Sequence, residues 1–147
     1  MDIIYPDVSG SFGQTPELTF PDGVAAPKGL RVKVIEEGTG RVVRAGDEIE
    51  VDYHGQIWDG PIFDSSYYRE GQAVFPIGVG MVIEGWDEAI VGKQVGSRLL
   101  ICVPPFKGYG PQGNPRAGIK GDDVLVFVVD IKGIQDSAFN FNTLHGN

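Results

Sequence analysis

Two uninterrupted apolar runs constrain the fold of this chain more than any other feature. They cover residues 98–103, in which only Arg98 is charged, and residues 124–129. Pro104 follows the first run and Gly133 lies shortly beyond the second, so both runs are followed by breaker residues. A short apolar run bounded in this way is typical of a strand that is covered on both faces. The sequence therefore predicts two central strands, the second ending at Gly133.

Two further segments predict strands with one buried face. In residues 48–54 the apolar side chains fall on odd positions and the polar ones on even positions, which places Tyr53 on the core face. Residues 30–34 have the same two-residue period. Together with the central strands, this pattern predicts a curved antiparallel sheet of five or six strands.

The segment Val82-Ile83-Glu84-Gly85-Trp86 introduces the single short helix that we predict. Asp87 and Glu88 bring negative charge to its first turn, as the helix dipole favours, and Gly92 marks its end. Because most of the surrounding chain is predicted as strand, Trp86 would lie against the concave side of the sheet. The fold class is therefore α+β, and the indole of Trp86 would form the floor of a hollow that suits a small apolar ring.

At 147 residues the chain has about the length of one domain. Its two ends lack the strand and helix patterns of the middle. Residues 1–28 hold four prolines with scattered glycines, and residues 135–147 are mostly polar. We therefore predict one domain at 29–134, between a loosely structured N-terminal extension, 1–28, and a C-terminal tail, 135–147. Deleting both extensions is expected to leave the activity within a few-fold of that of the full chain.

The net charge of −8 disfavours two classes of partner. It opposes phosphate backbones and anionic lipid, so we expect neither nucleic acid nor membrane as a partner. No apolar run approaches the roughly 20 residues of a membrane span, and residues 1–7 lack the basic and apolar regions of a signal peptide. The single cysteine, Cys102, cannot form an internal disulfide. These features predict a cytoplasmic protein.

Few residues could support covalent or metal chemistry. His54 and His145 are the only histidines and Cys102 is the only thiol, so we expect no metal site and no cofactor. Inside an apolar run, Cys102 is expected to be an inert core residue. If this protein is an enzyme, it is therefore expected to work without a nucleophile, a metal or a cofactor.

Five short motifs occur in order over residues 30–134. They are Val51-Asp52-Tyr53-His54-Gly55, Phe63-Asp64-Ser65-Ser66, Val82-Ile83-Glu84-Gly85-Trp86-Asp87-Glu88, Pro104-Pro105-Phe106-Lys107-Gly108-Tyr109-Gly110 and Leu125-Val126-Phe127. In order and spacing these motifs resemble those of the FKBP-type peptidyl-prolyl cis-trans isomerases. The resemblance implies an antiparallel half-barrel of five or six strands wrapped around one short helix, with the active site between them. It also implies an enzyme that accelerates rotation about Xaa-Pro bonds during protein folding, by desolvation and hydrogen bonding rather than covalent catalysis.

The same resemblance implies roles for residues by their position. Trp86 would form the floor of the pocket, with Asp64 at the rim facing Tyr53. The backbone N–H of Ile83 and the hydroxyl of Tyr109 would bind carbonyl oxygens of the ligand. The implied catalytic residues are Tyr53, Phe63, Asp64, Trp86, Tyr109 and Phe127. The implied substrate-binding residues are Phe75, Val82, Ile83 and Ile119, and no metal ligand is implied.

The chain departs from the family pattern at three places. Ala73 stands where many members have an aromatic residue, and Asn114 stands where many have a histidine. The loop between Pro115 and Ile119, which carries the position of the family's apolar flap residue, is one residue longer than usual. The loss of the aromatic wall at Ala73 is expected to change the contacts of a substrate subsite.

Two functions remain open. The first is an isomerase that acts as a monomer on proline-containing peptides and unfolded proteins and binds rapamycin or tacrolimus. The second is a non-catalytic module that binds proline peptides or macrolides, or acts as a holdase chaperone. The short segment between Gly110 and the last predicted strand leaves no room for the chaperone domain that some family members insert there. Without the resemblance, Val82, Ile83 and Phe127 could be plain core residues and Asp64 part of an Asx turn.

Overall fold

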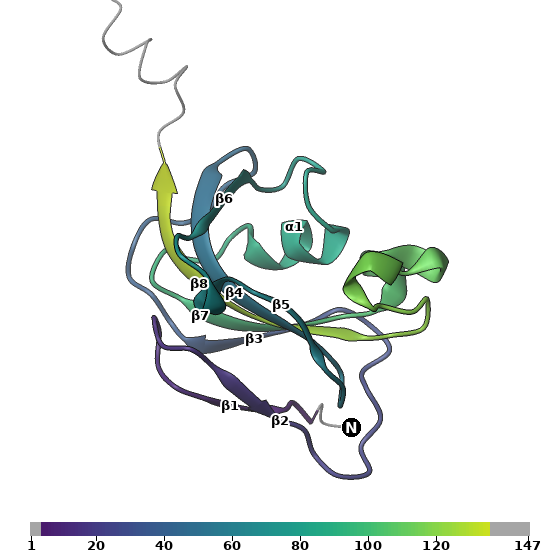
Figure 1. The fold of residues 1–147 in the computed structure, drawn as a ribbon. Coiled ribbons are helices and arrows are strands. Elements are labelled where there is room, and N and C mark those ends of the chain that lie inside the picture. Colours follow the sequence, from purple (N-terminus) through teal and green to yellow (C-terminus); the bar gives the residue numbers. More distant parts are fainter. Residues whose placement is uncertain (1–3, 136–147) are drawn as a thin grey trace, which may run out of the picture.

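The computed structural model describes residues 4–135, which form a curved antiparallel sheet with a short helix in its concavity and a hairpin on its outer side (Figure 1). The strands are β1 (Asp7–Ser9), β2 (Glu17–Thr19), β3 (Arg31–Glu36), β4 (Glu48–Ile57), β5 (Ile62–Ser65), β6 (Ala73–Pro76), β7 (Arg98–Val103) and β8 (Leu125–Gln135). The helix is α1 (Glu84–Ile90), and the 3-10 turns are η1 (Ser66–Tyr68), η2 (Pro105–Lys107), η3 (Gly110–Gln112) and η4 (Pro115–Ala117). No helix in this part of the chain is long and apolar enough to span a membrane.

The sheet has the strand order β3-β7-β8-β4-β5, and β6 also pairs with β4. The two predicted central strands, β7 and β8, are confirmed as inner strands, and every residue of β7 is buried. The predicted end of the second strand at Gly133 was wrong, because β8 continues to Gln135. The pairing of β4 with β8 shifts register between Glu50 and Val51. Beyond this shift the two strands remain paired, with Gly133 opposite Glu50. Such a bulge also bends the strands and adds to the curvature of the sheet.

The alternation in β4 places one face of this strand in the inner core. Ile49 and Val51 are fully buried, and they belong to the same apolar cluster as Trp86 and Ile90 of α1. Tyr53, on the same face, is half-buried and lies where this core opens into a cavity. The predicted core face of the strand is therefore confirmed, and its last aromatic side chain is available to a ligand.

The N-terminal extension was predicted to be loosely structured, and for residues 4–28 this prediction was wrong. β1 and β2 pair as an antiparallel hairpin, which lies outside the main sheet (Figure 1). Beneath it the outer face of the sheet forms a second buried cluster, Leu100, Cys102, Val126 and Val128. The side chains that cover this cluster from the extension are Tyr5, Val8, Leu18 and Phe20. The sequence did not reveal this hairpin because strands of three residues are too short to show a two-residue period. In addition, Tyr5 and Phe20, which help to cover the cluster, lie outside the two strands.

This second cluster changes what deletion of residues 1–28 is expected to do. Deletion would expose apolar side chains of β7 and β8, so the extension contributes to stability and is not a dispensable tail. It also keeps the thiol of Cys102 out of water, and this burial raises the pKa of Cys102 to about 12. The thiol is therefore protonated and unreactive near neutral pH, as predicted for an inert core residue. The predicted C-terminal tail lies outside the described residues apart from Gln135.

Candidate active site

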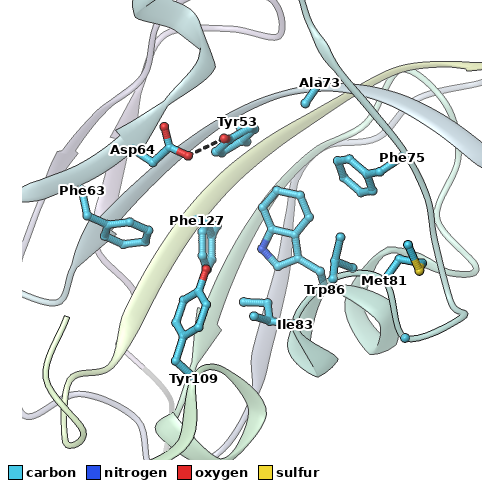
Figure 2. Close-up of a pocket in the computed structure, with 12 residues that line it drawn as sticks. Tyr53, Phe63, Asp64, Ala73, Phe75, Met81, Ile83, Trp86, Tyr109 and Phe127 are labelled. Atoms are coloured by element: carbon cyan, nitrogen blue, oxygen red, sulfur yellow. Dashed lines mark hydrogen bonds between the residues drawn. The ribbon is translucent and has the colours of Figure 1, made fainter. Parts of the chain in front are cut away.

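A cavity of about 530 Å³ opens between α1 and the concave face of the sheet (Figure 2). Its walls are mainly apolar and come from β4, β5, β6 and β8, from the loop before α1, and from the segment that follows β7. The lining residues are Tyr53, Phe63, Asp64, Ala73, Phe75, Gly80, Met81, Val82, Ile83, Trp86, Tyr109 and Phe127. Elements distant in the sequence thus supply a single aromatic-walled hollow.

Trp86 forms the floor, and aromatic rings surround it. The indole is 6% exposed and stands edge-to-face against Phe127 at 5.1 Å and against Tyr53 at 5.3 Å between ring centroids. Phe75 lies 5.5 Å from the indole on another side, and Phe63 packs edge-on against Phe127 at 5.6 Å. Such perpendicular contacts are favourable beyond the area they bury, so the rings support one another in a fixed arrangement.

The indole N–H of Trp86 is buried and has no hydrogen-bond partner among the described residues. In Figure 2 its nitrogen faces the side of Phe127. The rings of Trp86 and Phe127 are nearly perpendicular, at 87°, and the apolar ring of Phe127 offers the N–H no acceptor atom. The floor of the cavity therefore presents a flat apolar surface to a ligand.

Three polar side chains form a cluster at the rim. The Tyr53 hydroxyl donates to Asp64 (Figure 2), and the Arg69 guanidinium donates to Asp64 and to the Tyr53 oxygen, each at 2.7 Å. Burial raises the pKa of Tyr53, and its hydrogen bond to the Asp64 carboxylate adds to this rise. Burial also acts to raise the pKa of Asp64, but the hydrogen bonds from Tyr53 and Arg69 outweigh it and leave that pKa below its usual value. At neutral pH the cluster therefore consists of a neutral phenol, a carboxylate and a guanidinium.

The loop before α1 is tied to the helix through Asp87. Its carboxylate accepts hydrogen bonds from the backbone N–H of Gly78 at 2.6 Å and of Gly80 at 3.0 Å. Both glycines have a positive φ, 81° and 80°, a conformation that other residues adopt at a cost. This tie holds the loop against the helix where Met81 and Val82 line the cavity.

On the other side of the cavity, Lys107 joins η2 to α1. Its Nζ lies 3.0 Å from Glu84 and 2.6 Å from Glu88, so it bridges two successive turns of the helix. Tyr109 follows after one residue, and Figure 2 shows its hydroxyl reaching toward the space beside Phe127. The Tyr109 side chain is thus presented to the cavity from a loop that is attached to the helix.

All predicted site residues except Ile119 line this cavity. Ile119 is 4% exposed and belongs to the inner apolar core. It forms a two-way backbone bridge with Asn114, N–H to O at 2.9 and 3.0 Å, which closes residues 114–119 into a small loop. Ile119 does not line the cavity, and its predicted role in substrate binding stays a prediction. Ala73 lines the cavity at the position where the family often has an aromatic ring.

Sequence reasoning did not find three residues that shape the site. Arg69 completes the rim cluster, Met81 lines the cavity although it is 68% exposed, and Asp87 fixes the loop. A large apolar residue between glycine and valine in a predicted loop was a detectable signal for Met81. Arg69 carried no local signal, and the position of Asp87 in the first helical turn did not indicate its bonds to the loop, because the partners of both residues lie five to sixteen residues away.

A model of the FKBP-type peptidyl-prolyl cis-trans isomerase family matches residues 40–132 of this sequence. That range is more than half of the chain and includes every residue that lines the cavity. The chain belongs to the FKBP family. The family predicted from the five motifs is therefore confirmed, and with it the antiparallel sheet wrapped around one helix.

Relatives and a solved structure agree with this assignment. The FK506-binding protein of Streptomyces anulatus is 37% identical over 119 residues, which is 80% of this chain and 95% of that protein. FK506-binding protein 2 of Yarrowia lipolytica is 38% identical over 108 residues, 74% of each chain. The crystal structure of AtFKBP13 superimposes with a TM-score of 0.68 at 32% identity, covering 75% of this FKBP chain and 96% of the other.

Proposed function

We propose that this FKBP domain accelerates cis–trans exchange of Xaa-Pro bonds inside the aromatic cavity, without a covalent intermediate. The observation that carries the proposal is the hollow itself: a flat indole floor, aromatic walls and a mainly apolar lining next to a small polar rim. A prolyl ring fits such a hollow, and the peptide on either side of it can extend over the rim.

The physical reason lies in the amide bond. Rotation about it faces a barrier of about 18–20 kcal/mol, because the twisted amide loses resonance. Water stabilises the planar, charge-separated amide by hydrogen bonding to its oxygen. An apolar cavity removes this water and favours the twisted, less polar form, so the site binds the transition state more tightly than the ground state. Lowering the barrier by ~5 kcal/mol would accelerate exchange by a few thousandfold.

Two donors are assigned to orient the substrate. The backbone N–H of Ile83, at the start of α1, and the hydroxyl of Tyr109 would each donate to a carbonyl oxygen of the bound peptide. The Tyr53–Asp64–Arg69 cluster holds the Tyr53 ring in place at the opposite rim. These contacts fix which bond of the peptide lies in the apolar part of the site.

The direct test is a peptide isomerisation assay with a Xaa-Pro substrate. We expect catalysed exchange at micromolar protein, and we expect rapamycin or tacrolimus to inhibit it, because such ligands would occupy the same cavity. Exchange at the rate of buffer alone, with well-folded protein, would contradict the enzymatic function. Drug binding in that same inactive sample would instead support a non-catalytic proline- or macrolide-binding module.

Tryptophan fluorescence gives a second prediction, because the two indoles lie in different places. Trp86 is the cavity floor, whereas Trp58 packs edge-on against Phe20 at 5.2 Å beside the outer cluster. Rapamycin is therefore expected to change the emission of the Trp58→Phe variant and to leave that of the Trp86→Phe variant nearly unchanged. The opposite pattern in parallel titrations would place the ligand outside the cavity.

The substrates proposed for this site are proline-containing peptides and unfolded proteins, bound by a monomer. The cytoplasmic location inferred from the sequence stays a prediction. Ala73 leaves one side of the cavity without an aromatic wall, so Ala73→Phe is expected to strengthen binding of substrates with a large residue before proline, because it adds apolar area beside that subsite.

A further inference from the structure

A buried ion pair joins the two inner strands behind the cavity. Arg98 of β7 and Asp130 of β8 have fully buried side chains, with Nε to Oδ1 at 2.7 Å and Nη2 to Oδ2 at 2.9 Å. Removing both charges from water is costly, and good geometry with further hydrogen bonds is needed to offset that cost. The further hydrogen bonds come from two segments outside the inner strands. One is the turn between β1 and β2, and the other is η1, which leads to the rim of the cavity.

The first segment is the turn between β1 and β2. The Arg98 guanidinium donates to the carbonyl oxygen of Gly10 at 2.9 Å and to that of Gln14, and the N–H of Gly13 donates to Asp130 Oδ2 at 2.8 Å. This N-terminal turn, residues 10–14, lies outside the range that the family model matches. A segment outside the matched range thus reaches a fully buried carboxylate of the domain.

The N-terminal turn has anchors of its own. The ring of Phe12 lies 4.8 Å from the ammonium group of Lys132, and the Phe12 N–H donates to Glu36 at 2.7 Å. A cation over an aromatic face and a charge-assisted hydrogen bond both favour one position of the turn. The turn is thus held on β3 and β8 independently of the ion pair.

The second segment is η1, which leads directly to the rim of the cavity. The Tyr67 hydroxyl donates to Asp130 Oδ2 at 2.6 Å, the same oxygen that accepts from Gly13. Tyr67 is two residues before Arg69, whose N–H donates to the Ser66 carbonyl oxygen at 3.2 Å as η1 ends. Fixing Tyr67 therefore fixes the point from which the Arg69 side chain reaches Tyr53 and Asp64.

The N-terminal turn and the residues that follow η1 face each other across a polar cavity of about 340 Å³. Gly13 lines it together with Tyr67 and Arg69. Asp130 accepts from both segments, and Arg98 also contacts both, since its Nη2 donates to the Tyr67 hydroxyl at 3.4 Å and to the carbonyl oxygen of Gln14. The Arg98–Asp130 ion pair thus connects the N-terminal turn physically to the rim cluster, and the carboxylate of Asp130 makes the shorter hydrogen bond to Tyr67, 2.6 Å against 3.4 Å.

We propose that the N-terminal turn and Tyr67 position Arg69 at the active site through the buried carboxylate of Asp130. The turn holds this carboxylate in one orientation, the carboxylate holds the Tyr67 hydroxyl, and the short η1 transmits that placement to Arg69. Arg69 then holds the Tyr53 hydroxyl and the Asp64 carboxylate at the rim. The proposal rests on the isomerase site described above and adds positioning residues that do not line its cavity.

Tyr67→Phe tests the connection, because it removes one hydroxyl and keeps the ring. We expect kcat/KM for a Xaa-Pro peptide to fall by about three- to tenfold, as for a lost hydrogen bond to a charged group. Carbon-13 NMR titration is expected to find a higher pKa for Asp64 than in the unchanged protein, because Arg69 holds that carboxylate less firmly. Tyr68→Phe is the matched control: its side chain is exposed, and both quantities are expected to stay unchanged.

Phe12→Ala tests the contribution of the N-terminal turn itself. It removes the ring that lies under Lys132 and leaves every residue of η1 and of the rim in place. We expect kcat/KM and the pKa of Asp64 to change in the same directions as in Tyr67→Phe, by a smaller amount. A shift in Tyr67→Phe without any in Phe12→Ala would overturn the role of the turn.

An unchanged pKa of Asp64 in Tyr67→Phe would overturn the whole proposal, whatever happens to its melting temperature. The NMR measurement requires no turnover, so it separates this proposal from the isomerase function. A protein that shows the Asp64 shift but no catalysis would retain the positioning network and contradict only the enzymatic role.

Discussion

Replacing Asp130 by alanine is expected to lower the free energy of unfolding by about 3–5 kcal/mol, because it leaves the Arg98 guanidinium buried without its counter-charge. The change also removes the acceptor of Tyr67 and of Gly13, so the hairpin and η1 lose a common attachment. Urea denaturation followed by circular dichroism measures the effect. We expect a lower midpoint with a similar slope.

Two further variants show whether the buried charge causes this loss. Arg41→Ala breaks an exposed ion pair with Asp47 and is expected to cost under about 1 kcal/mol. The double variant Arg98→Met with Asp130→Leu removes both charges and keeps apolar volume, so it is expected to be more stable than Asp130→Ala. A loss in Asp130→Ala no greater than that in Arg41→Ala would show that the pair is not important for stability.

Gly55→Ala is expected to lower the isomerase activity by displacing the aromatic walls of the cavity. Gly55 lies in β4 beneath two cavity rings, and an added Cβ would lie 2.7 Å from Phe63 Cζ and 3.0 Å from Phe127 Cε1. At least one ring must move, and the space open to it is the cavity. Overpacking of this kind costs about 1–3 kcal/mol. If that cost falls on substrate binding, kcat/KM decreases by about tenfold or more.

The matched control is Gly133→Ala in the neighbouring strand β8, where an added Cβ meets nothing within 4 Å. We expect Gly133→Ala to catalyse exchange of the Xaa-Pro peptide at the same rate as the unchanged protein. Equal activities of the two variants would contradict the assignment of Phe63 and Phe127 as walls that must keep their positions. Rapamycin affinity, measured in parallel, is expected to follow the same order as turnover.

The inner part of the fold could be predicted from the sequence because its signals are local. The continuous apolar run of β7 and the alternation in β4 each reflect burial of neighbouring residues, and both were predicted correctly. The N-terminal hairpin was missed because its strands have three residues each and the side chains that bury it are spread from Tyr5 to Phe20. No window of a few residues contains that pattern.

The residues of the candidate site also divide into those with a local sequence signal and those without one. The aromatic residues of the cavity could be placed by motif, since Trp86 and Phe127 lie within distinctive segments. The position of Ile119 outside the cavity lining did not follow from its residue type, because its loop is closed by a backbone bridge to Asn114. Arg69 was missed because its role depends on tertiary contacts: it follows η1, whereas its partners Tyr53 and Asp64 lie in β4 and β5. Properties that arise from tertiary contacts were therefore the ones that the sequence did not supply.

The tie between Asp87 and the loop before α1 has a kinetic consequence. A loop that is already fixed loses little conformational entropy when a ligand arrives, so the open cavity requires no closing step before binding. Association rates for different ligands would then be similar and governed by diffusional encounter. Selectivity among ligands would be expressed in how long each one stays, that is, in the dissociation rate.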